Sequence, residues 1–216
     1  MTIESADGLT EVEEDALAEI ANLGVSRAAN SLRQMLGEQV FLAVPKVQIV
    51  DRQTASALVG RGSHSSKLVA VQQSFDGPFA GKALLIFPEA QSLELVRTIV
   101  GEQHSLEDVI DLEQEALAET GNIILNACLA TIANLLRRPM HMSLPAVIRG
   151  SGETLFGGPG AKDNLVLFLY IDFRTKARDI QGFIALLMDL PSITALKTIV
   201  TDYIRNVELG TDQAAR

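Results

Sequence analysis

The sequence has a single cysteine, Cys128, and only three histidines among its 216 residues. One thiol cannot form an intrachain disulfide or supply a cluster of thiolate ligands, which fits a reducing compartment. The histidines, His64, His104 and His141, have no neighbouring ligand spacing and predict no metal site. We therefore expect Cys128 to be a small buried residue, and the chain to need no metal or other cofactor of its own.

Basic residues are also fewer than acidic ones. The sequence has 18 Lys and Arg against 27 Asp and Glu, which gives a formal net charge of −9. This balance argues against sequence-independent nucleic-acid binding, which depends on cations that neutralise phosphates. No apolar run approaches the roughly 20 residues that span a bilayer. The acidic start, MTIESADGLTEVEED, lacks the basic and apolar segments of a secretory signal. The sequence thus predicts a cytoplasmic protein that binds neither nucleic acid nor membrane.

The first half of the chain reads as a long helix, three strands and a second helix. Apolar residues recur at helical spacing from Glu11 to Leu36, with Thr10 and Glu13 as a capping box and Gly37 as a stop. Pro88 then opens a second helix that runs to about residue 100. Between the helices lie three β-rich segments, at residues 40–50, 67–74 and 79–87.

The second half repeats this order. A helix is predicted at about residues 106–137 and another after Pro191, with strands near residues 140–148, 165–173 and 180–188. Short stretches of sequence recur as well, since RTIV at residues 97–100 returns as KTIV at residues 197–200. Duplication is the simplest account of this pattern.

The predicted fold class is α+β, with one antiparallel sheet packed with the two long helices. Three strands alone would leave an unpaired sheet edge, so we expect the two halves to pair into one pseudo-twofold domain. The predicted domain covers residues 1–208, with pseudo-repeats at about 8–103 and 104–208. Composition predicts a mobile loop at Gly150–Gly160, and residues 209–216 read as a frayed tail.

A spaced set of polar residues occurs once in each half. The two copies are Asp15-x3-Glu19-x2-Asn22-x22-Pro45 and Glu115-x3-Glu119-x2-Asn122-x22-Pro145. On a helix the first three residues of each copy fall within about 60° of one another, so each trio forms one polar stripe.

Apolar residues occupy the opposite side of both long helices, and we expect them to face the core. They are Leu17, Ala21, Ala28, Leu32 and Met35 in the first helix, and Leu117, Ile124, Cys128, Ile132 and Leu135 in the second. Polar residues on an outward helix face are usually only solvated surface. However, Asn is a poor helix former, so an exposed Asn inside a helix needs a reason. Repetition of the whole set favours a functional role.

This spacing resembles the signature of the CheC/CheX/FliY phosphatases of bacterial and archaeal chemotaxis, which is Asp or Ser, then Glu, Asn and Pro. The stretches EIANLGVSRAANSL and ETGNIILNACLATIANLL look like the two long helices of the CheC branch. Two motif copies point to CheC rather than CheX, and the resemblance covers nearly the whole chain. One departure is Glu115, which stands where the family has Asp or Ser.

The resemblance implies a phosphatase (hydrolase) that dephosphorylates the aspartyl phosphate of a CheY-like response regulator. In such an enzyme Asn22 and Asn122 would orient the attacking water, because a carboxamide both accepts and donates hydrogen bonds. Glu19 and Glu119 would bind a lysine beside the phosphorylation site. Magnesium would come with the regulator. Asp15 and Glu115 would either assist docking or be solvated surface, and we read the two prolines as structural.

A rival reading is a non-catalytic interaction protein in chemotaxis or the motor switch. The motor-switch protein FliM shares the fold of this family without the motif, and CheC proteins also bind the receptor deamidase CheD, which makes CheD a candidate second partner. Both Asn/Glu pairs are present here, which favours catalysis. The sequence leaves open which regulator is the substrate, how the activities of the two sites compare, and the oligomeric state.

Overall fold

The computed structural model describes residues 8–37, 39–61, 67–100, 106–136, 139–157, 164–175 and 179–208. The helices are α1 (Glu11–Leu36), α2 (Arg52–Arg61), α3 (Glu89–Val100), α4 (Leu106–Leu136), α5 (Gly152–Phe156) and α6 (Leu190–Glu208). The strands are β1 (Phe41–Asp51), β2 (Leu68–Asp76), β3 (Gly81–Pro88), β4 (His141–Met142), β5 (Ala146–Gly150), β6 (Asn164–Arg174) and β7 (Asp179–Asp189).

The seven strands form one antiparallel sheet in the order β1-β6-β7-β3-β2-β4, with β5 also paired to β2. At the centre β3 of the first half pairs with β7 of the second. At the edges the halves exchange strands, since β1 pairs with β6 while β4 and β5 pair with β2. The expected α+β fold with a single antiparallel sheet is therefore confirmed, and strands of the two halves alternate within that sheet.

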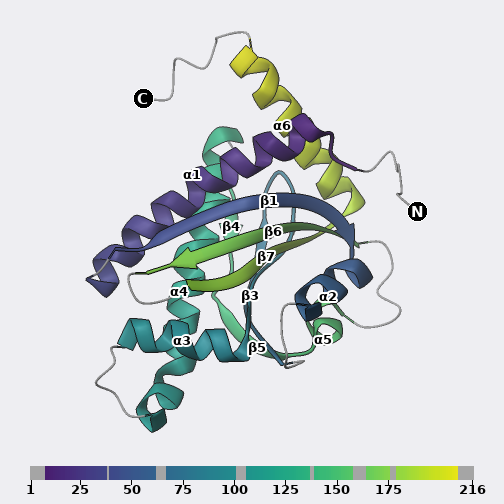
Figure 1. Cartoon of the computed structure of the whole chain (residues 1–216). Coiled ribbons are helices and arrows are strands. Elements are labelled where there is room, and N and C mark those ends of the chain that lie inside the picture. The colour runs from purple at the N-terminus through teal and green to yellow at the C-terminus, as the bar shows by residue number, and fades with distance from the viewer. Residues whose placement is uncertain are drawn as a thin grey trace.

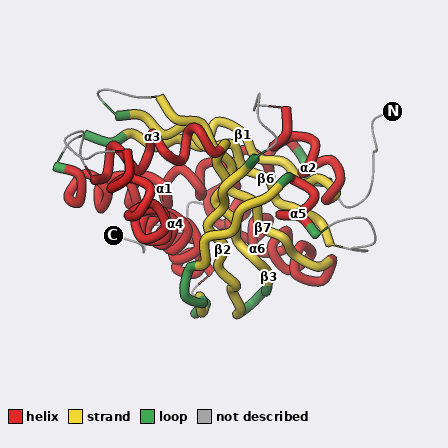
Figure 2. Tube along the Cα trace, turned by 90° about the horizontal axis from the view of Figure 1, so that it is seen from below, coloured by secondary structure: helices red, strands yellow, loops and turns green. Residues whose placement is uncertain are grey.

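Helices cover both faces of this sheet. The larger core lies between one face and the helices α1, α3, α4 and α6, and a smaller core lies between the other face and α2 and α5. Successive residues of a strand point to opposite faces of the sheet, so Leu85 of β3 lies in the larger core and Ile86 lies in the smaller one. Figures 1 and 2 show α1 and α4 on one side of the strands and the pair α2 and α5 on the other.

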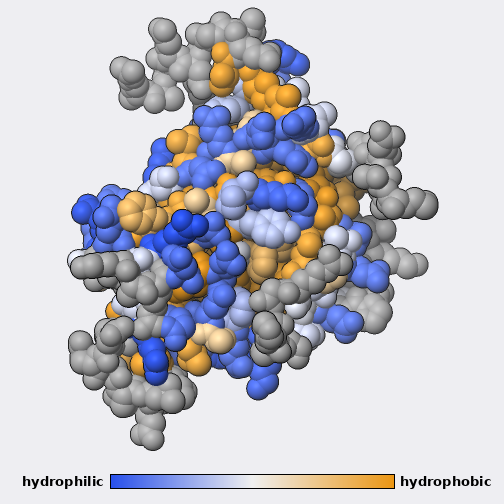
Figure 3. Space-filling view, in the orientation of Figure 1, coloured by the Kyte–Doolittle hydropathy of each residue, from blue (hydrophilic) through white to orange (hydrophobic). Residues whose placement is uncertain are grey.

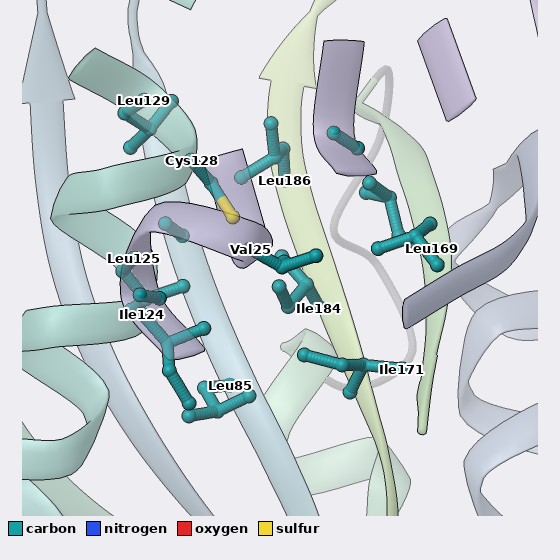
Figure 4. Close-up of a cluster of buried hydrophobic side chains, with 14 of the residues drawn as sticks. Val25, Leu85, Ile124, Leu125, Cys128, Leu129, Leu169, Ile171, Ile184 and Leu186 are labelled. Atoms are coloured by element: carbon teal, nitrogen blue, oxygen red, sulfur yellow. The ribbon is translucent and has the colours of Figure 1, made fainter. Parts of the chain in front are cut away.

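The two long helices meet where a glycine allows close approach. A Cβ added at Gly24 of α1 would lie 2.8 Å from the Cα atom of Cys128 in α4. Figure 4 shows Val25 of α1 and Cys128 of α4 close to Ile184 and Leu186 of β7. Burial raises the pKa of the Cys128 thiol to about 12, so the residue is an inert core side chain, as the sequence predicts.

The α4 helix is apolar enough to resemble a membrane span. Residues Leu112–Asn134 reach the necessary length and hydropathy, but 56% of that window is buried inside the protein. Packing between α1, α3 and the sheet accounts for this composition. On the face shown in Figure 3, hydrophobic side chains also gather over the end of α6, where Val207 is half exposed.

The structure confirms the predicted boundaries of α1 and its caps. Thr10 and Glu13 form a capping box, and Gly37 ends the helix with φ 68°. The carboxylate of Glu13 also accepts from Thr201 of α6; these hydrogen bonds outweigh the larger single effect of burial, so the pKa of Glu13 is lowered.

Two expectations about local structure were wrong, and one helix was missed. Residues Gly152–Phe156 of the predicted loop form α5, because Ser151 caps it and Leu155 and Phe156 are buried against α2. The helix α2 was not predicted, since its mean hydropathy is low and only its Ala55 and Val59 are buried. Met35 is 40% exposed rather than in the core, because the last turn of α1 extends past the sheet.

Some predicted features lie outside the described residues or side chains. The side chain of Leu135, the histidines at 64 and 104, the end of the predicted loop after residue 157 and the tail from residue 209 belong to this group. The remaining predicted core residues of the two long helices are buried.

Candidate functional site

The two acidic stripes lie on the outer faces of α1 and α4. Asp15, Glu19, Glu115 and Glu119 are all exposed. None of them makes a hydrogen bond or ion pair with another residue that the structure describes. These carboxylates are therefore available to a partner, and the helices fix their spacing.

Asn22 differs from these carboxylates because it is half-buried and makes three hydrogen bonds to the backbone. Its Nδ2 donates to the carbonyl oxygens of Ala18 at 2.8 Å and Val44 at 3.0 Å, and its Oδ1 accepts from the N–H of Val44 at 2.8 Å. One lone pair of Oδ1 is left without a partner in the described part of the chain. The site therefore presents a fixed acceptor.

The contact between Asn22 and Val44 explains the proline in the motif. The β1–β6 register breaks between Ala43 and Lys46, so Val44 and Pro45 have no paired residue on β6. Pro45 has no N–H to donate, and the carboxamide of Asn22 takes the place of a neighbouring strand for Val44. The structural role that we predicted for Pro45 agrees with its place in this bulge.

Asn122 occupies the corresponding place on α4 but bonds to side chains. Its Oδ1 accepts from Gln73 Nε2 at 3.1 Å and from Asn126 Nδ2 at 2.7 Å. Its Nδ2 has no hydrogen bond to any residue that the structure describes. The second site therefore presents a donor where the first presents an acceptor.

The chain segment beside Asn122 is also more open than its counterpart. Ser143, Leu144 and Pro145 separate β4 from β5. Leu144 is 89% exposed, whereas Val44 at the same place in the first half is 1% exposed. Ser143 stays tied to the sheet, because its N–H donates to the carbonyl oxygen of Ser74.

The sequence interpretation missed Gln73 and Asn126. The sequence does carry a signal for Gln73, which is a polar residue at an inward position between Val71 and Phe75 of a strand. Asn126 lies one helical turn after Asn122, on the same face. The repeated motif did not indicate either residue, because neither belongs to it.

The chain is similar in sequence to chemotaxis phosphatases. The family model for chemotaxis phosphatase CheX matches residues 69–166. A CheC1 protein of Halobacterium salinarum is 28% identical over 138 residues, which cover 63% of this chain and 69% of that protein. The CheY-P phosphatase CheC of Bacillus subtilis is 24% identical over 144 residues, covering 65% of this chain and 68% of that protein.

The resemblance to the CheC/CheX/FliY family is confirmed.

Solved structures of this group share the fold. FliY of Thermotoga maritima superimposes with a TM-score of 0.72 at 15% identity, over 90% of this chain and 98% of that one. The FliM middle domain of H. pylori gives a TM-score of 0.58 at 9% identity, over 88% of this chain and 99% of that one. At these identities the likeness concerns the fold alone.

Proposed function

We propose that this CheC-like chain is a phosphatase that hydrolyses the aspartyl phosphate of a CheY-like response regulator in chemotaxis. The observation that carries the proposal is the recurrence, on two helices, of a positioned carboxamide one turn from an exposed glutamate. The name of the Bacillus subtilis relative, a CheY-P phosphatase, agrees with it. We expect the protein to act in the cytoplasm.

In the proposed reaction, water attacks the phosphorus of the acyl phosphate in line with the leaving carboxylate. The P–O bond to the aspartate breaks, both protons of the water leave with the phosphate, and the aspartate returns as a carboxylate. Such a reaction needs alignment of the water and stabilisation of charge more than covalent chemistry. Magnesium would be held by the regulator.

Asn22 and Asn122 would contribute that alignment. The unpaired lone pair of Asn22 Oδ1 can accept a hydrogen bond from the water, and the unpaired N–H bonds of Asn122 can donate hydrogen bonds to an oxygen of the water or phosphoryl group. Glu19 and Glu119, exposed on the same faces, would bind a lysine of the regulator. Asp15 and Glu115 extend the same acidic surface.

The test is phosphate release from a phosphorylated CheY-like regulator mixed with the protein. We expect release to be faster with the wild type than with buffer, and close to the buffer rate with the double variant Asn22→Ala/Asn122→Ala. Circular dichroism of the double variant should show that it is folded. An equal rate for wild type and double variant would refute the catalytic roles.

A binding role is the second candidate, and the fold shared with the FliM middle domain favours it. In that case the protein would bind a motor-switch component or a CheD-type deamidase through the same surface. Stable binding of one of these partners, together with no faster phosphate release from the regulator, would support this alternative.

A further inference from the structure

Gln73 is a polar residue at a core position of β2. It is 1% exposed, and its neighbours on the same face of β2, Val71 and Phe75, belong to the larger core. Buried polar groups cost stability unless their hydrogen bonds are made. The presence of Gln73 in this core therefore needs an explanation.

The first motif has an apolar residue at the corresponding place. Gln73 lies on β2 between the residues that pair with β4 and those that pair with β5, opposite Leu144 and Pro145. Ile171 lies on β6 at the break in the β1–β6 register, opposite Val44 and Pro45. Ile171 is therefore the counterpart of Gln73, and it is a buried core residue.

The hydrogen bonds of Gln73 fix the orientation of the Asn122 carboxamide. Gln73 Nε2 carries two hydrogens, and one is donated to the carbonyl oxygen of Ser143 at 2.9 Å. The other points to Asn122, so Asn122 must turn its oxygen inward to accept it. Asn126 donates to the same oxygen, which occupies the second lone pair. The NH₂ group of Asn122 is then the part that remains for a substrate.

We infer that Gln73 is a positioning residue for the second site, which holds Asn122 with its NH₂ group directed to the reacting oxygen atoms. This inference rests on the proposed phosphatase function and assigns the donor role specifically to Asn122. Because a preorganised donor needs no rearrangement during the reaction, its orientation affects the turnover step more than docking.

Stability alone does not account for this arrangement. Within the described part of the chain, Gln73 Oε1 is buried without a hydrogen-bond partner, as is Asn126 Oδ1. An unsatisfied buried oxygen opposes folding. A side chain of similar length and no polar atoms would remove this cost, so a purely structural role predicts that replacing Gln73 is harmless.

The experiment isolates the second site by using Asn22→Ala as the reference protein. One derivative of this reference carries Gln73→Met, because methionine has a similar length and makes no such hydrogen bonds. A second carries Ile171→Met, the matched control at the counterpart position. Gln73→Met is also combined with Asn22→Ala/Asn122→Ala. Phosphate release is measured over a range of phosphorylated regulator concentrations, and the melting temperature of each variant is recorded.

We expect Gln73→Met to lower the maximal rate of the reference on the order of tenfold or more, with an unchanged half-saturating concentration and an equal or higher melting temperature. Ile171→Met should leave the rate unchanged, and Gln73→Met should have no effect once Asn122 is alanine. An unchanged maximal rate would overturn the inference. An equal loss in the absence of Asn122 would overturn it too.

Asn126→Ala provides a second route, since it removes the other donor to Asn122 without touching the sheet. It should lower the maximal rate in the same Asn122-dependent way, and an unchanged rate would count against the positioning network. If the reference itself releases phosphate no faster than Asn22→Ala/Asn122→Ala, the failure lies in the proposed function of the second site rather than in the role of Gln73.

Discussion

Asn22 holds Val44 by two hydrogen bonds, with its Oδ1 accepting from the Val44 N–H at 2.8 Å and its Nδ2 donating to the Val44 carbonyl oxygen at 3.0 Å. The side chain thus ties α1 to the bulge in β1, where no strand residue is available to do so. Asn22, which we propose as a catalytic residue, therefore also stabilises the fold.

The first prediction concerns the stability of Asn22→Ala. The variant should lose about 1–3 kcal/mol of unfolding free energy, because the buried backbone of Val44 would lose both of its partners. Asn122→Ala should lose less, since its partners are side chains that can rearrange. Urea unfolding of both variants measures the difference, and a larger loss for Asn122→Ala would contradict it.

The second prediction concerns the division of activity between the sites. Asn22→Ala and Asn122→Ala should each remove only the contribution of their own site, on the order of 10²-fold at that site. Each single variant would therefore keep the activity of the other site, measured as phosphate release from the phosphorylated regulator. Complete inactivity of a stably folded single variant would show that the sites do not act independently.

The third prediction concerns docking through the exposed glutamates. Glu119→Lys should weaken association with the phosphorylated regulator more than Glu119→Ala, because it would place a cation opposite the partner's lysine. Thermal stability should hardly change, since Glu119 is exposed and unpaired within the described residues. The matched control is Glu153→Lys on α5, an exposed site on the other side of the sheet. Equal weakening by both reversals would indicate only a general effect of charge.

The fourth prediction concerns the crossing of α1 and α4. Gly24→Ala should destabilise the protein by about 1–3 kcal/mol, since its Cβ would lie 2.8 Å from the backbone of Cys128. Gly60→Ala in α2 is the control, because a Cβ there meets no atom of the described residues within 4 Å, and the substitution should stabilise the helix by about 0.4–1 kcal/mol. Thermal denaturation of both variants would check the opposite signs.

The fifth prediction concerns acid sensitivity at the start of α2. The backbone N–H of Thr54 donates to Asp51 at 2.7 Å, and this bond, helped by the Thr54 hydroxyl, lowers the pKa of Asp51. A carboxyl whose pKa is lowered on folding stabilises the protein above its unfolded pKa, near 3.8, and that stabilisation is lost as the pH falls through the folded value. The stability advantage of the wild type over Asp51→Asn should therefore shrink below about pH 4. A constant difference between pH 7 and pH 3 would contradict this.

The elements with local signals could be predicted from the sequence. The first helix was predictable to the residue because Thr10, Glu13 and Gly37 specify its ends chemically. The ends of the other strands were predictable within about two residues, as their apolar runs are long, but the segment predicted as one strand at residues 140–148 forms two, β4 and β5. The short helix α5 was not, because its glycine-rich sequence has the composition of a loop and only tertiary contacts bury Leu155 and Phe156.

The candidate sites were predictable only in part. The motif located the exposed glutamates and the two asparagines, since repetition is visible in the sequence. It did not reveal that Asn22 bonds to Val44 while Asn122 bonds to Gln73, because these contacts depend on how the sheet pairs. Near-identical motifs thus yielded an acceptor at one site and a donor at the other.

The exchange of edge strands has a consequence for how the protein is made. Val50 of β1 pairs with Val166 of β6, so β1 leaves the ribosome long before its partner has been synthesised. At roughly 5–20 residues per second, the nascent first half would wait several seconds with its sheet incomplete. Contacts so distant along the chain also slow folding. The protein is therefore most exposed to aggregation during synthesis, while its N-terminal half has been made and the partner strands of that half have not.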